Sequence, residues 1–272
     1  MRVGGLFVKY VLLTRTILAL PGSGEKDKCK AARRMRMGTT KKILLVLSGL
    51  IPLLGLVGKP PDPQLCIYTA FVVVVLLRRQ FEALVGRLPG SAALHLVVMF
   101  VLSGSFAEIL AWMNSYFRAA EHPALLHPQL IPDLILGFGL YGGWAVAWLI
   151  AFRWFQFNLL EVFLATGFLG IVLEQLGAVF QAMMRALTVN PLQSLAMGAY
   201  LLTVYGSVAG LALAPLVNRL DSPEKHRSWV RFPVVIALLV VLGVSGIYLM
   251  GLCALAMDGL PPKRSIIEHP LW

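Results

Sequence analysis

Two long runs without a charged side chain, residues 192–217 and 232–257, constrain this chain more than any other feature. An apolar helix of about 20 residues crosses the hydrocarbon core of a bilayer. Only 14% of the residues are charged and the mean hydropathy is +0.78, whereas soluble domains carry about 25% charged residues. The sequence therefore excludes a soluble enzyme, a nucleic-acid-binding domain and a disordered chain, and it predicts an all-α, multi-pass integral membrane protein.

Five further apolar stretches extend the count to about seven transmembrane helices. Two of them are short: one contains Pro52, and the other includes Arg78 and Arg79, whose charged groups would have to reach the interface. The predicted spans lie near residues 43–58, 65–85, 91–112, 133–152, 155–180, 192–217 and 232–257. The transmembrane domain is thus expected to cover residues 43–257, followed by a short tail, 258–272.

The distribution of Lys and Arg predicts the orientation, because these residues concentrate in cytoplasmic loops. With seven spans and a cytoplasmic N-terminus, most basic loop residues fall on the cytoplasmic side, and omitting one short span reverses the balance. We therefore predict a cytoplasmic N-terminus, an external C-terminus and residence in the plasma membrane.

Residues 1–42 are strongly basic and allow several interpretations. They could form a lipid-binding arm, or a flank that only sets the topology. Alternatively, translation starts at Met35 or Met37, and residues 43–58 are a cleaved signal sequence.

Two regions of the chain resemble each other at an offset of 64 to 66 residues. In each, a glycine precedes an acid by four positions, and a Tyr-Gly pair follows in the next span; the matched residues are Gly104 and Gly170, Glu108 and Glu174, Tyr141 and Tyr205, and Gly142 and Gly206. This pattern predicts a tandem repeat of a two-helix unit. The alternative is a chance alignment, because membrane helices are rich in glycine.

Acids within predicted spans are candidate functional residues, since an ionisable group in a membrane is costly. Glu108, Glu174 and Asp133 fall toward the external side, whereas Glu161 falls toward the cytoplasmic side, within reach of Arg153 or the loop at 78–87. We expect Glu108 and Glu174 to form a pair that binds a proton or a cation, with Asp133 as an auxiliary group.

Other polar residues are expected to have auxiliary roles. They are Arg118, Arg185, His95, Glu161 and Gln181. The competing interpretation pairs Glu108 with Arg118, and Glu174 with Arg185, as salt bridges between helices.

No motif points to a metal, a nucleotide or a covalent cofactor. His122 and His127 each precede a proline and are five residues apart, which is not the helical spacing of a zinc motif. Cys29, Cys66 and Cys253 are widely separated, so a disulfide framework is not expected. No predicted span contains a lysine that could hold retinal.

Two functional classes remain, together with a structural one. The favoured one is a transporter of small solutes, ions or protons, or the membrane subunit of one. The alternative is a membrane enzyme that acts on a lipid or isoprenoid by carboxylate acid–base chemistry, and the third is a structural or assembly subunit of a membrane complex. The expected partners are the lipid bilayer, further subunits or copies of the same chain, and no nucleic acid.

Overall fold

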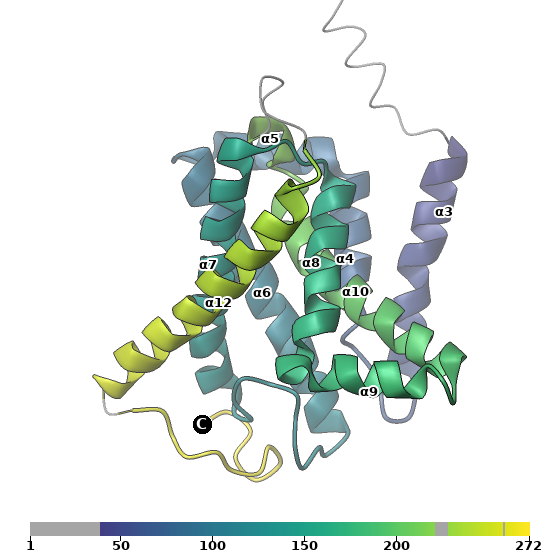
Figure 1. Cartoon of the computed structure of the whole chain (residues 1–272), viewed down its shortest axis with the longest axis vertical. Helices are drawn as coiled ribbons and strands as arrows, with labels where there is room; N and C mark the ends of the chain where they lie inside the picture. The colour runs from purple at the N-terminus through teal and green to yellow at the C-terminus, as the bar shows by residue number, and fades with distance from the viewer. Residues whose placement is uncertain (1–38, 221–227, 258) are drawn as a thin grey trace, which may run out of the picture. The chain divides into compact units, whose positions relative to one another are not determined.

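A computed structural model describes residues 39–220, 228–257 and 259–272, and its regular structure there is helical (Figure 1). Residues 45–272 form one compact unit, and residues 1–44 form another, of which only the beginning of the first helix is described. Positions 1–38 of the predicted basic arm, which include Met35 and Met37, lie outside the described residues.

The helices follow one another with short connections. Their bounds are α3 Thr39–Leu50, η1 Ile51–Val57, α4 Cys66–Leu76, α5 Arg78–Arg87, α6 Ala92–Phe117, α7 Leu130–Trp154, α8 Leu159–Leu173, η2 Glu174–Gly177, α9 Ala178–Ala186, α10 Pro191–Leu213, α11 Val217–Leu220 and α12 Arg231–Leu255, where η denotes a 3₁₀ helix.

Five segments of the described chain are long and apolar enough to cross a membrane: α3 with η1, α6, α7, α10 and α12. A sixth is present if α8 and α9 together count as one span. These long apolar helices fit a multi-pass membrane protein. Helix α4 is also apolar but has only 11 residues.

The span expected at 155–180 is not one continuous helix. Helix α8 ends at Leu173, and the angle between α8 and α9 is 88°. Figure 1 shows this change of direction. Gln175 and Gly177 adopt positive φ values of 48° and 87°, which no α-helix accommodates. The span expected at 65–85 is also divided, because α4 ends at Leu76 and α5 starts at Arg78.

The bundle is built from closely packed helix pairs. Helix α7 packs against α6 and α12, and α10 packs against α4, α6 and α8. The α7–α12 contact depends on glycine, because a Cβ atom on Gly139 would lie 2.1 Å from the carbonyl oxygen of Gly246. Small residues provide such close approach in membranes, where lipid offers no hydrophobic drive for helix association.

The C-terminal tail, residues 259–272, folds against the segment that leads into α7. The backbone N–H groups of Leu130 and Ile131 donate to the carbonyl oxygens of Pro270 and Leu271, each over 3.1 Å. The Gln129 side chain donates to the Arg264 carbonyl oxygen over 3.0 Å. We call this end of the bundle the tail-side end; α6 ends there and α7 and α10 begin there (Figure 1).

Candidate functional site

A tyrosine and a glutamate from neighbouring helices form the first element of the site. The hydroxyl of Tyr141 on α7 donates to Oε1 of Glu108 on α6 over 2.6 Å. The Tyr141 ring is buried against Gly104, where an added Cβ would lie 2.1 Å from ring carbons. Gly104 precedes Glu108 by about one helical turn, so the glycine makes room for the ring of the tyrosine that binds the acid.

A second pair has the same composition and the same local packing. The Tyr205 hydroxyl on α10 donates to Oε2 of Glu174, the residue at which α8 gives way to η2. Here Gly170 admits the ring, because an added Cβ would lie 2.1 Å from a Tyr205 ring carbon. The two acids therefore occupy equivalent environments, except that Glu174 lies at a helix break.

Asp133 joins the first pair from the beginning of α7. Its side chain is fully buried, and its Oδ1 accepts the backbone N–H of His127 over 2.9 Å. Its carboxyl interacts with that of Glu108. The other oxygen, Oδ2, is buried and has no hydrogen-bond partner.

We call the three acids, Glu108, Asp133 and Glu174, the carboxylate cluster. Glu174 lies within electrostatic range of Glu108. Trp144 links the two tyrosines, with its ring centroid 5.6 Å from that of Tyr141 and 6.2 Å from that of Tyr205. The structure thus places Glu108 beside Asp133, and Glu174 farther away, on the other side of the Tyr141–Trp144–Tyr205 ring contacts.

The competing interpretation, in which Arg118 and Arg185 pair with these acids, does not match the partners that the structure gives the two arginines. Arg118 pairs with Asp62 over 3.2 Å, and the exposed Arg185 donates to Gln181 over 3.4 Å on α9. The reason is local: α9 turns away from the bundle, and the loop before α4 places Asp62 beside the end of α6. Within the described ranges, no ion pair reaches a member of the carboxylate cluster.

Between the Arg118–Asp62 pair and the cluster lies a polar contact that the sequence did not reveal. Oε1 of Gln64 accepts the Tyr200 hydroxyl over 2.7 Å and the Asn114 amide over 3.3 Å. One side chain at the start of α4 therefore connects α6 and α10 at the tail-side end. Gln64 could not be identified from residue spacing in the sequence, because it lies in an irregular loop. Tyr141 and Tyr205, by contrast, were marked by their offset.

Glu161 and His95 lie at the opposite end of the bundle, away from the cluster. Glu161 pairs over 2.6 Å with Arg231, which is buried and lies over the rings of Phe157 and Phe232. The sequence named Arg153 or a loop at 78–87 as the nearby basic group, whereas 78–87 is helix α5 and the structure pairs Glu161 with Arg231, because α12 begins beside the start of α8. His95 contacts the Pro89 carbonyl oxygen over 3.2 Å.

His127 connects the cluster to the tail. Its Nδ1 accepts the Gln129 backbone N–H over 3.2 Å, so Nε2 carries the ring proton and donates to the Pro261 carbonyl oxygen over 3.1 Å. Burial lowers the pKa of His127, and the charge of Lys263 lowers it further. The geometry therefore favours the neutral ring.

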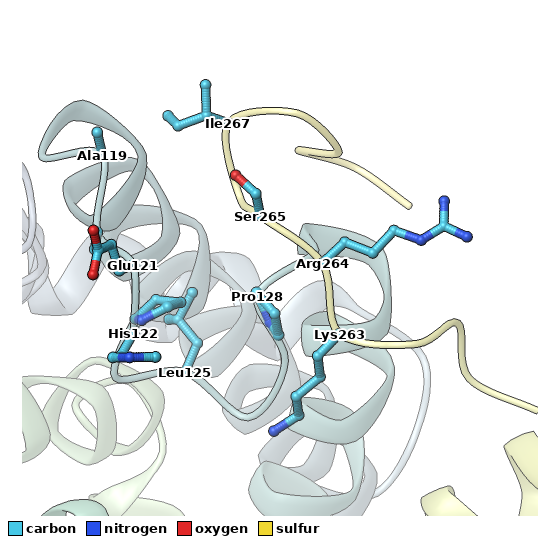
Figure 2. Close-up of a pocket in the computed structure, with 11 residues that line it drawn as sticks. Ala119, Glu121, His122, Leu125, Pro128, Lys263, Arg264, Ser265 and Ile267 are labelled. Carbon is cyan, nitrogen blue, oxygen red and sulfur yellow. The ribbon is translucent and has the colours of Figure 1, made fainter.

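A surface cavity of about 560 Å³ lies beside this loop at the tail-side end. Figure 2 shows the loop after α6 on one side, with Glu121 and His122, and the tail on the other, with Lys263 and Ser265. The cavity has room for a small polar molecule and contains both acidic and basic side chains.

In the part of the chain that the structure describes, no three His, Cys, Asp or Glu side chains are arranged to hold a metal ion. No protein-family model, no curated protein and no solved structure matches this chain. What can be inferred about its function therefore depends on the geometry of the cluster.

Proposed function

We propose that this chain is a plasma-membrane protein that binds and releases protons within its helical bundle. It acts as a proton-coupled transporter of small solutes, or as the membrane subunit of one. Glu108 and Glu174 are the coupling carboxylates, and Asp133 assists them.

The observation that carries the proposal is that three acids lie in the bundle, and no basic side chain of the described residues 39–220, 228–257 and 259–272 forms an ion pair with them. The groups that donate hydrogen bonds to them are neutral: two tyrosine hydroxyls and one backbone N–H. Burying an unpaired carboxylate is strongly unfavourable, and such a group takes up a proton or a cation instead. The side chains are not arranged as a metal site, so the proton is the favoured ligand.

The proposal includes a tandem duplication. Each half contributes a glycine, a glutamate and a tyrosine in matching contact, from α6 and α7 in one half and from α8 and α10 in the other. Two sites derived from one ancestral hairpin would give a proton two neighbouring positions within the bundle. Such positions are typical of proton relays in pumps and transporters.

The proposed topology has seven passes, with α4 and α8 as two short ones, a cytoplasmic N-terminus and an external C-terminus. The tail-side end would then face the exterior, and the carboxylate cluster would lie nearer that face. The surface cavity beside the loop after α6 would be accessible to external solutes.

Proton uptake tests the proposal directly. The purified protein in lipid nanodiscs is shifted from pH 9 to pH 5.5 with a dye that reports bound protons. Exposed carboxyls, which titrate near pH 4, contribute little in this window. We expect the double variant Glu108→Gln, Glu174→Gln to bind at least one proton fewer than wild type, and the loop variant Glu121→Gln to match wild type. Equal uptake by wild type and the double variant would overturn the proposal.

A second measurement separates transport from enzymatic catalysis. Proteoliposomes on a solid-supported electrode are exposed in turn to the twenty amino acids, to monosaccharides and to nucleosides. A current in wild type that the double variant lacks supports proton-coupled transport. Proton uptake without any solute-driven current favours the lipid enzyme.

A further inference from the structure

The strongest unexplained feature within the cluster is one oxygen atom of Asp133. The side chain is fully buried, and Oδ1 is satisfied by the His127 N–H, yet Oδ2 has no hydrogen-bond partner. Leaving a buried acceptor unsatisfied costs about 1–3 kcal/mol, and more when the group is charged. Something must therefore supply a donor at Oδ2.

Glu108 is the neighbour that can do so. Its Oε1 accepts the Tyr141 hydroxyl, and its Cγ lies 3.5 Å from the position of a Cβ on Gly137, one helical turn after Asp133 on the same face of α7. Each acid thus has a donor of its own on one oxygen. If both acids were ionised, two negative groups would face each other without a donor between them, and this arrangement is unfavourable at short range.

We propose, on the basis of the proposed proton-handling function, that Glu108 and Asp133 share one proton, with Glu108 as the acid and Asp133 as the carboxylate that accepts its O–H. The pair carries one negative charge when the proton is bound. Transfer of that proton to Glu174 or to water leaves a second negative charge on the pair.

The environments of the two acids assign the proton to Glu108. Asp133 lies in the first turn of α7, where the backbone N–H groups and the helix dipole favour a negative charge. It also accepts a backbone N–H from His127, and such a bond stabilises the ionised form. Glu108 lies 16 residues into α6, far from the N-terminus of its helix, and accepts the neutral Tyr141 hydroxyl.

Infrared spectroscopy distinguishes a shared proton from two ionised acids. We expect wild type in nanodiscs at pH 7 to show a C=O band of a protonated carboxylic acid, shifted in D₂O. Glu108→Gln should remove this band. Asp133→Asn should also remove it, because an amide at position 133 can donate to Glu108 and makes the proton unnecessary. Both variants keep an acceptor for their existing donors, so we expect them to fold.

Two control variants complete the experiment. Asp62→Asn affects an acid of the Arg118 pair at the partly exposed edge, and Glu174→Gln affects the other coupling acid; both should retain the band. The shared proton would be overturned if wild type lacked the band, or if the band survived Glu108→Gln. It would also be overturned if the band were lost only with Glu174→Gln, or appeared only when sodium is removed. The outcome is separate from that of the proposed function, because proton uptake at Glu174 or a solute-driven current could persist in any of these cases.

Discussion

Replacing Gly104 with alanine tests whether glycine packing positions the site. The new Cβ would lie 2.1 Å from two ring carbons of Tyr141, so the ring must move away from α6. Overpacking of this kind costs about 1–3 kcal/mol, and the lost hydrogen bond to Glu108 costs about 1 kcal/mol more. We therefore expect a destabilisation of about 3 kcal/mol.

Gly142 provides a matched control on α7. A Cβ at this position meets nothing within 4 Å, so Gly142→Ala should be neutral or stabilise the helix by up to about 1 kcal/mol. Thermal unfolding of the purified proteins in one detergent measures the difference. Since a domain of this size shifts by roughly 2–4 °C per kcal/mol, Gly104→Ala should melt roughly 6–12 °C below wild type. Equal melting temperatures for the two alanine variants would refute the reasoning.

Three further predictions concern other parts of the bundle. Arg231→Met should cost about 1.5–3 kcal/mol, because it removes the charged hydrogen bond that the buried guanidinium makes to Glu161 over 2.6 Å; adding Glu161→Leu should recover part of the loss in a double-mutant cycle. The pKa of His127 is about 6.5 in the unfolded chain and lower in the fold. The neutral ring should therefore stabilise the fold fully above about pH 6.5, and this stabilisation should be lost as the pH drops through the lowered pKa. The melting-temperature difference between wild type and His127→Gln should therefore shrink from pH 8 to pH 5, and a difference that grew would contradict the assignment. Gln64→Leu should cost about 1–3 kcal/mol by leaving two donors without their acceptor, and adding Tyr200→Phe should restore part of it; no recovery would exclude the bond as the cause.

The convergence of Glu108, Asp133 and Glu174 could be predicted from the sequence because an acid in an apolar helix is rare and its depth follows from residue counting. The long helices α6, α7, α10 and α12 could be predicted for the same reason, since their apolar runs are continuous. Hydropathy, however, averages over a window and cannot distinguish a straight span from a bent one. The break after Leu173 arises from two residues with positive φ, Gln175 and Gly177. The mean hydropathy of the segment does not reveal their backbone conformation.

The partners of the charged residues could not be predicted, because they depend on loops without periodicity. Arg118 binds Asp62 across a loop and the start of another helix, and Glu161 binds Arg231 across a gap of 70 residues. The docking of the tail was also missed, since residues 259–272 carry no helical pattern. Its contacts are mostly to backbone atoms, which any sequence provides.

That docking has a practical consequence for handling the protein. Pro270 and Leu271 accept hydrogen bonds from the residues that open α7, and the same short segment contains the His127 and Asp133 contact. A purification tag or reporter fused directly after Trp272 would therefore disturb the segment that holds Asp133 of the carboxylate cluster. Proteins prepared for functional assays should carry the fusion at the opposite terminus, or behind a cleavable linker that is removed before measurement.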